Sequence, residues 1–282
     1  MPGQDPTETH LPARLRLGHI IYSNCFPVHS RLLDQPQPGD PLLVEGVPSA
    51  LNALLAEGGV DVAPASSIEY AMHADRYRLL PDLVIGSHGP VRSIVFISDR
   101  PPEDLENRTV AIPTASATSV VLLKILLRLR WRAWPRFQWF DQGTEDPFAR
   151  GANAALFIGD VALRRDLLST HTVRLDLGLE WWKEISLPFP FALWQVASGT
   201  PEALRRLHAT LLDSRAFWAA GPQRLAERYA SHFQMGASEL EEYWRDLTFD
   251  LDSRMVEGLE SFYRLAVEIG ELDAAPPLRW IE

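Results

Sequence analysis

Five short segments combine hydroxyl, amide or carboxylate side chains with the pattern of a strand that runs into a helix or turn. Such side chains lie at the carboxyl ends of strands, which is where open α/β sheets bind ligands. Their hydroxyl and amide groups, together with the free N–H groups of a helix start, suit a small carboxylate. The segments are 18–27, 64–70, 86–93, 113–120 and 156–160.

Asn24 is the candidate catalytic group of the first segment. Its amide offers two N–H donors and one carbonyl acceptor without carrying a charge. It can hold a substrate hydroxyl or carboxylate, or it can satisfy the backbone of its own turn, and the residues alone leave both open. The neighbouring Cys25 is the single cysteine of the chain, so no internal disulfide forms, and we interpret it as a packed thiol.

Hydroxyl side chains recur in three further segments. Ser67 stands at a helix start, where it either caps the helix or contacts a ligand oxygen. Ser93 enters a strand and faces either the ligand or solvent. In the fourth segment, four hydroxyl residues fall within the six positions 114–119, which is more than one helix cap requires. We therefore expect an anion site that includes Ser116, Thr118 and Ser119.

Asp160 is the carboxylate that we single out, because it follows a strand and a glycine. It either caps the next helix or orients a ligand hydroxyl. The 8 histidines show no paired spacing such as HxxxH, and no CxxC pair exists, so we predict no metal. The motifs GxGxxG, GxxxxGK[ST] and GxSxG are absent from the sequence, which disfavours the commonest nucleotide-binding and hydrolase functions.

Charge and hydropathy narrow the class of partner. The 282 residues include 37 acidic and 27 basic side chains, a formal net charge of −10, and no Lys/Arg run, so we predict no nucleic-acid partner. The sequence starts without a basic-then-apolar leader pattern, and its most apolar stretch, 120–127, is too short to span a bilayer. We therefore expect a cytoplasmic protein with no membrane partner.

Strand and helix patterns alternate through the first two thirds of the chain, as in an α/β sheet protein. After a tail at 1–13 that reads as loose, the expected strands are 15–21, 42–45, 60–63, 91–98, 109–113, 137–140, 154–158, 171–176 and 189–196. The expected helices between them are 29–33, 48–56, 67–72, 116–130 and 161–168. The end of the chain reads as helical at 201–219, 221–232, 238–247 and 252–269.

Two successive α/β units followed by helices predict two lobes with a ligand cleft between them. We assign residues 1–96 and 193–282 to lobe I and residues 97–192 to lobe II. The strands at 91–98 and 189–196 are the candidate crossings between the lobes. Two independent domains in a row remain the alternative, and the sequence does not indicate an oligomeric state.

The same segments resemble the chorismate dehydratases of the futalosine route to menaquinone. The resemblance runs in order through Gly18-His19-Ile20 with Asn24-Cys25-Phe26-Pro27, Asp61-Val62-Ala63-Pro64 with Ser67-Ile68-Glu69-Tyr70, Gly89-Pro90-Val91 with Ser93, Ala115-Ser116 with Thr118-Ser119-Val120, Ile158-Gly159-Asp160-Val161-Ala162-Leu163, and Leu187-Pro188-Phe189 with Phe191-Ala192. It spans about residues 15 to 195, and the helical tail also fits. The pair Thr114-Ala115 departs from the small-residue pattern of the family.

That resemblance implies a fold like the type II periplasmic binding proteins, with two crossing strands and a ligand between two lobes. It implies dehydration of chorismate to 3-[(1-carboxyvinyl)oxy]benzoate with neither a metal nor an organic cofactor. Asn24 matches the catalytic asparagine of the family. The carboxylate-binding regions correspond to the segments that contain Ser67, Ser93, Ser116, Thr118 and Ser119, and Asp160 joins them as a substrate-binding residue.

Other functions fit parts of the same pattern. A solute-binding protein would share the fold without chemistry, although the missing leader pattern disfavours it. The sister enzyme that forms dihydroxynaphthoate would need a catalytic histidine in a distinct motif, and we see none. A ligand-sensing domain would carry a DNA-binding helix pair or basic face, and neither stands out. Because no His–Asp or Glu pair offers a general base, the enolpyruvyl carboxylate of the substrate is the candidate proton acceptor.

Overall fold

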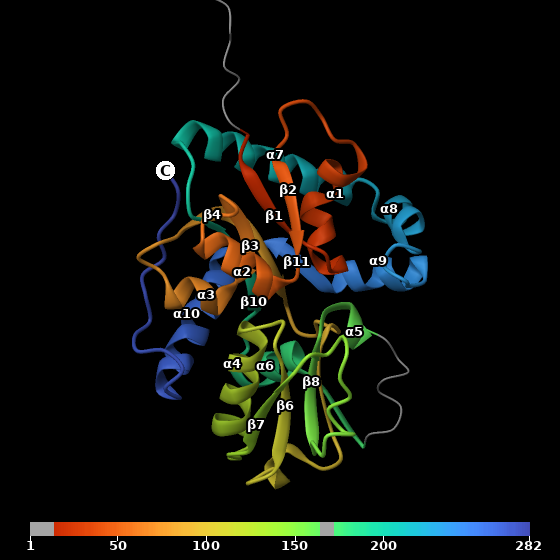
Figure 1. The fold of residues 1–282 in the computed structure, drawn as a ribbon, viewed down its shortest axis with the longest axis vertical. Coiled ribbons are helices and arrows are strands. Elements are labelled where there is room, and N and C mark those ends of the chain that lie inside the picture. Colours follow the sequence, from red (N-terminus) through yellow and green to blue (C-terminus); the bar gives the residue numbers. More distant parts are fainter. Residues whose placement is uncertain (1–13, 164–171) are drawn as a thin grey trace, which may run out of the picture.

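The computed structural model describes residues 14–163 and 172–282 and contains two β-sheets with helices around them (Figure 1). The tail expected at 1–13, the end of the helix expected at 161–168 and the first residue of the strand expected at 171–176 lie outside the described residues. The remaining elements can be compared with the sequence pattern one by one.

The first sheet has six strands, and its parallel strands end at one edge. They are β1 (Arg16–Ile20), β2 (Leu42–Gly46), β3 (Val62–Ser66), β4 (Arg78–Ser87), β10 (Phe189–Val196) and β11 (Leu247–Asp250). Their order across the sheet is β11-β4-β10-β3-β1-β2. β1 runs parallel to β2 and β3, whereas β10 lies antiparallel between β3 and β4.

The second sheet has five strands and repeats this arrangement on a smaller scale. They are β5 (Ile94–Ser98), β6 (Thr109–Pro113), β7 (Arg136–Phe140), β8 (Ala154–Ile158) and β9 (Val173–Asp176). Their order is β7-β6-β8-β5-β9. β6 is parallel to β7 and β8, and β5 is antiparallel to β8 and β9.

Helices follow most of the parallel strands and then form the end of the chain (Figure 1). No helix within 14–163 and 172–282 is both long and apolar enough to cross a membrane. The α-helices are α1 (Phe26–Asp34), α2 (Pro48–Ala56), α3 (Ser67–Met72), α4 (Thr118–Ile125), α5 (Gly159–Leu163), α6 (Leu177–Ile185), α7 (Pro201–Ala219), α8 (Pro222–Tyr229), α9 (Ala237–Asp246) and α10 (Ser253–Glu268). Two 3₁₀ turns, η1 (Ser23–Cys25) and η2 (Pro102–Asp104), and a π-helical turn, η3 (Leu126–Arg130), complete the set.

Aromatic packing joins the helical end of the chain to both sheets. Phe262 of α10 is fully buried, and its ring lies edge-on to Trp181 of α6 and to Phe189 of β10, at centroid distances of 6.4 and 5.0 Å. Each such edge-to-face pair adds about 0.5–1.5 kcal/mol beyond the area that it buries. Because α6 lies between β9 and β10, this cluster fixes the chain where it returns from the second sheet to the first.

The chain changes sheet twice, at 88–93 and at 177–188, and Asp176 ties the two crossings together. Its carboxylate accepts hydrogen bonds from the N–H groups of Val91 (3.0 Å) and Arg92 (2.6 Å), and it caps α6 through the N–H of Leu179 (3.0 Å). Burial raises the pKa of Asp176 in spite of these bonds. A division into two lobes stays a prediction, and the boundaries proposed at 96/97 and 192/193 fall inside β5 and β10.

Most expected elements are confirmed, and the differences have local causes. β4 was missed because Pro81 and Asp82 interrupt its pattern, and Asp82 has a left-handed φ of 63°. β11 is a four-residue strand at the end of a stretch that reads as helix. The helix expected at 116–130 is α4 followed by η3, and the strand expected at 91–98 begins at Ile94.

Replacement of Asp176 with alanine leaves three N–H groups without their acceptor. At about 1–3 kcal/mol for each buried unsatisfied donor, we expect the free energy of unfolding to fall by about 3 kcal/mol or more. Urea titration followed by tryptophan fluorescence measures the change. Asp252→Ala is the control, because Asp252 caps α10 through one N–H group, that of Met255, and should cost about 1 kcal/mol. Equal losses in the two variants would contradict the role assigned to Asp176.

Candidate functional site

The segments singled out from the sequence lie at strand ends of both sheets. η1 follows β1, α3 follows β3, α4 follows β6 and α5 follows β8, while Ser93 directly precedes β5. β1 and β3 are parallel, so their carboxyl ends share one edge, and the same holds for β6 and β8. Contacts between η1 and α5, and between α3 and α4, bring the two edges together.

Asp160 joins the fifth segment to the first. Its carboxylate accepts hydrogen bonds from the hydroxyl of Ser23 (2.5 Å) and from its backbone N–H (3.1 Å). The preceding Gly159 has a φ of 63°, and a Cβ at this position would meet the ring of Tyr22 at 2.9 Å. Glycine is therefore required here both by backbone conformation and by space. Asp160 holds the turn that carries Asn24 against α5.

Thr118 joins the fourth segment to the second. Its hydroxyl oxygen accepts a hydrogen bond from the N–H of Ile68 (3.1 Å), so the first residue of α4 supplies a partner for the first turn of α3. Ser67 donates its hydroxyl proton to the carbonyl of Pro190 (2.7 Å), and its own carbonyl accepts from the hydroxyl of Tyr263 (2.7 Å). Both Thr118 and Ser67 are buried.

Ser116 and Ser119 hydrogen-bond each other at the start of α4, whose N-cap position is Ala117. The hydroxyl of Ser116 accepts from the N–H of Ser119 (3.4 Å) and donates to the Ser119 hydroxyl (3.0 Å). Ser119 is buried, whereas Ser116 is partly exposed. The hydroxyl of Ser116 is therefore engaged within its own segment, although the N-cap residue of α4, Ala117, makes no side-chain capping bond.

Ser93 lies beside an aromatic residue from the helical end of the chain. Its hydroxyl accepts a hydrogen bond from the hydroxyl of Tyr243 on α9 (2.8 Å), and its carbonyl accepts from the N–H of Gly159 (2.8 Å). Ser93 is 2% exposed and Tyr243 is 1% exposed, which excludes the alternative of a solvent-facing serine. Burial raises the pKa of Tyr243, so its phenol stays protonated and remains a donor.

Asn24 sits on the 3₁₀ turn η1 and offers a free acceptor. Its carbonyl oxygen is buried and accepts no hydrogen bond from any residue that the structure describes. Trp244 of α9 donates its ring N–H to the carbonyl of Ser23 (2.8 Å) and stacks on Phe26, which holds the turn on its other side. An unsatisfied buried acceptor costs about 1–3 kcal/mol, and a substrate donor would remove that cost.

The predicted hydroxyl residues fall into two groups, according to whether the hydroxyl already donates its proton to another protein atom. Ser67 and Ser116 already donate their protons to protein oxygens. Ser93, Thr118 and Ser119 accept hydrogen bonds within the protein and keep their own protons available. Since a carboxylate can only accept, the second group is the one that can bind it.

Sequence reasoning missed the aromatic residues that support this site. Tyr243, Trp244 and Tyr263 come from α9 and α10, whose sequence showed only a helical pattern. Their burial follows from helical spacing, but the pattern does not tell which hydroxyl or ring N–H reaches which distant serine. The helical tail therefore supplies partners for three of the predicted segments.

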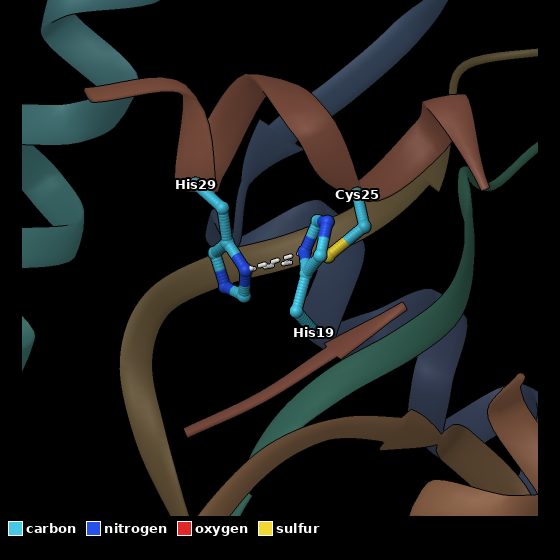
Figure 2. A group of neighbouring side chains, drawn as sticks. All are labelled: His19, Cys25 and His29. Carbon is cyan, nitrogen blue, oxygen red and sulfur yellow. Dashed lines mark hydrogen bonds between the residues drawn. The ribbon is translucent and has the colours of Figure 1, made fainter. Parts of the chain in front are cut away.

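A second group that the sequence did not reveal lies beneath the turn: His19 of β1, Cys25 of η1 and His29 of α1 (Figure 2). All three are buried, and one potential ligand atom of each lies within 4.8 Å of the others. Nδ1 of His29 is 2.9 Å from Nδ1 of His19 and 3.8 Å from Sγ of Cys25. Its members form CxxxH plus a histidine on the preceding strand, so they lack the HxxxH and CxxC spacings on which the expectation of no metal was based.

Burial keeps the members of this group uncharged. It lowers the pKa of His19 to about 4, and it lowers the pKa of His29 well below the ordinary value. It also raises the pKa of the Cys25 thiol to about 12. At neutral pH the group therefore contains two neutral imidazoles and a thiol.

The two histidines make the protein less stable in mild acid. The unfolded chain binds protons at both histidines from about pH 6.5 downward, whereas the folded chain does not bind one at His19 until about pH 4. The free energy of unfolding therefore falls as the pH drops through this window, by about 3 kcal/mol for His19 alone at about 1.4 kcal/mol per pKa unit.

Urea titrations at about pH 7.5, 6 and 5 measure this loss. The double variant His19→Gln/His29→Gln removes both imidazoles and should show a smaller loss over the same interval. The same pH dependence in both proteins would show that the histidines do not titrate as their burial requires.

Solved structures share this fold. A protein from Archaeoglobus fulgidus superposes with a TM-score of 0.76 at 18% identity, over 93% of this chain and 100% of that one. The periplasmic aliphatic sulphonate binding protein of Escherichia coli superposes with a TM-score of 0.64 at 13% identity, over 96% and 94% of the two chains. The predicted fold, α/β and like the periplasmic binding proteins with a helical end, is thereby confirmed.

Sequence similarity is more specific than fold. The chain is 30% identical over 261 residues to the chorismate dehydratase of Thermus thermophilus, which covers 87% of this chain and 93% of that protein. A family described as menaquinone biosynthesis matches residues 15–268. That match includes all the strand-to-helix segments described above, and the chain belongs to this menaquinone biosynthesis family.

Proposed function

We propose that the protein is a chorismate dehydratase, a lyase that removes water from chorismate to give 3-[(1-carboxyvinyl)oxy]benzoate. Membership of the menaquinone biosynthesis family and the similarity to a chorismate dehydratase support this activity. A biosynthetic enzyme of this kind would act in the cytoplasm, on a small dianionic substrate. The observation that carries the proposal is the buried, unpartnered carbonyl oxygen of Asn24 at the meeting point of the two sheets.

Chorismate offers groups that match the site. It carries two carboxylates and a ring hydroxyl at C4, and loss of that hydroxyl with the proton at C3 makes the ring aromatic. Because the product is strongly favoured, the enzyme has to place the substrate and stabilise the developing charge, and it needs no strong base. The enolpyruvyl carboxylate takes the C3 proton while the C4–O bond breaks, and the resulting carboxylic acid passes that proton to the departing hydroxide, which leaves as water and restores the carboxylate.

Three hydroxyls with free protons are proposed to bind the carboxylates. Ser93 directly precedes β5, and Thr118 and Ser119 come from the first turn of α4. They are neutral donors, and the nearby cation of Arg92 is already paired with Asp246 and Glu242. Such donors are oriented by the protein before the substrate arrives, so that little reorganisation accompanies binding.

Asn24 is proposed to hold the leaving hydroxyl. Its carbonyl oxygen accepts the hydroxyl proton of the bound substrate, and its N–H group supports the oxygen as the C4–O bond breaks. We propose that Asp160 serves the substrate indirectly, through Ser23 of the same turn, because its carboxylate already accepts from that residue. Ser67 and Ser116, whose protons are donated within the protein, would shape the site.

A solute-binding protein is the alternative that the fold allows, since the sulphonate binding protein shares it. Incubation of the purified chain with chorismate separates the two functions. The dehydratase consumes chorismate and releases one water per product, which mass spectrometry detects as a loss of about 18 Da. Tight binding with chorismate recovered unchanged would instead support the solute-binding protein.

Asn24→Ala should lower kcat much more than it changes KM. Loss of one group that stabilises a developing charge costs about 10²–10³ in rate, and the carboxylate contacts remain. Steady-state kinetics with chorismate measure both constants, and circular dichroism checks the fold. Asn52→Ala on α2 is the control, since Asn52 bonds Glu69 on α3, and it should keep kcat. A rise in KM equal to the fall in kcat would reduce Asn24 to an anchor.

Replacements of the hydroxyl residues should affect KM differently, depending on whether the hydroxyl proton is free or is donated within the protein. Ser93→Ala, Thr118→Val and Ser119→Ala each remove a donor to a carboxylate, and KM should rise roughly 10- to 100-fold, in line with about 1.5–3 kcal/mol for a hydrogen bond to a charged group. Ser67→Ala and Ser116→Ala should change KM by less than about 3-fold and lower the melting temperature instead. Equal effects on KM across all five variants would contradict this division.

A further inference from the structure

Behind the turn that carries Asn24, ring nitrogens form a chain of hydrogen bonds through the core. Trp194 of β10 donates its ring N–H to Nε2 of His29 (3.2 Å), and Nδ1 of His29 lies 2.9 Å from Nδ1 of His19. His19 precedes the turn η1, Cys25 is the last residue of that turn, and His29 lies one helical turn further along α1, with the imidazoles facing each other (Figure 2). This series of hydrogen bonds therefore connects both ends of the turn to the middle of the first sheet.

Trp194 fixes the donor-to-acceptor direction of these hydrogen bonds. A tryptophan ring N–H can only donate, so Nε2 of His29 must be an acceptor. A neutral imidazole carries one proton, which places the proton of His29 on Nδ1 and directs it to Nδ1 of His19. His19 then carries its proton on Nε2. One pair of tautomers satisfies the contacts of His29 with both Trp194 and His19, and both rings are neutral in it.

The same donor-to-acceptor direction disfavours a metal ion, although two histidines and a cysteine are suitable zinc ligands. A histidine that binds a metal through Nδ1 must hold a proton on Nε2, and that proton is normally donated to a carboxylate, carbonyl or water. Here Nε2 of His29 already receives the N–H of Trp194. Metal binding would break that bond inside a fully buried core.

We propose that His19 and His29 are positioning residues, which hold the turn between β1 and α1 so that Asn24 meets the substrate in a fixed orientation. Trp244, which is itself fully buried, and Asp160 bind this turn through Ser23, whereas His19 and His29 lie against Cys25 at its end. The turn has to be held firmly, because the unpartnered oxygen of Asn24 would otherwise gain a partner if the turn relaxed.

This inference deepens the proposed function, and its first test does not depend on activity. Histidine-selective ¹⁵N labelling of the full chain reports the protonated nitrogen of each ring at neutral pH. We expect His29 protonated at Nδ1 and His19 protonated at Nε2. One equivalent of zinc chloride should leave these signals unchanged. The opposite tautomers, or signals of both rings that shift with stoichiometric zinc, would overturn the inference and assign a metal site instead.

The second test uses variants that differ in polarity. Glutamine at position 29 can accept from Trp194 through its oxygen and donate to His19 through its nitrogen, whereas leucine can do neither. We expect His29→Leu to lower kcat about 10-fold or more with less than about 3-fold change in KM, and His29→Gln to recover most of that loss. Trp194→Phe, which keeps a ring and removes the N–H, should lower kcat by several-fold even if His29→Leu does not fold.

His208→Gln on α7 is the matched control, since the polar contacts of this histidine in the described part of the chain are with the carbonyl of Pro81 and the side chain of Asp82, away from the turn. It should retain the kcat of the parent protein. If His29→Leu and His29→Gln both keep that kcat and lose only melting temperature, the pair is ordinary packing and the inference fails. If the unsubstituted protein does not consume chorismate, the proposed function fails, and the tautomers measured by NMR still decide whether the histidine chain exists.

Discussion

Two hydrogen-bonded contacts between the sheets determine what this protein can do. Ser23 donates to Asp160, and the N–H of Ile68 donates to Thr118. Each contact joins a strand-to-helix junction of the first sheet to one of the second, so residues that lie 50 or 137 positions apart along the chain become neighbours. Asp176 adds a third constraint at the crossings, and together these contacts limit the ways in which the two sheets can face each other.

The sequence predicted the junctions better than the contacts between them. The local composition of segments such as Ser116 to Ser119 indicates where a strand ends and a helix begins, and this signal does not depend on distant parts of the chain. The partners of Ser93 and Ser67 could not be found in this way, because Tyr243 and Tyr263 lie on helices near the end of the chain whose pattern indicates burial and nothing more. β4 was missed for a related reason: Pro81 breaks the local pattern, and pairing with β10 and β11 restores the strand.

The group of His19, Cys25 and His29 shows why proximity alone is a weak guide to chemistry. Three potential ligands within 4.8 Å would ordinarily suggest a metal ion. The hydrogen bond from Trp194 argues against a metal ion, because it fixes which nitrogen of His29 is the acceptor. Neutral rings also suit this position, since a buried imidazolium behind the turn would have to be stabilised by a carboxylate, and His19 instead faces the imidazole of His29.

The hydroxyls and Asn24 would have different roles, because the substrate and the product share their carboxylates and differ in the C4 hydroxyl. Both carboxylates of chorismate survive in 3-[(1-carboxyvinyl)oxy]benzoate, so hydroxyls that grip them bind both molecules and contribute equally before and after the reaction. Strong cationic clamps would therefore slow product release without speeding the chemical step, which fits a site whose nearby arginine, Arg92, is already paired. The C4 hydroxyl is the group that the reaction removes. An uncharged acceptor held in place for that hydroxyl, the role that we propose for Asn24, can discriminate the substrate from the product where carboxylate contacts cannot.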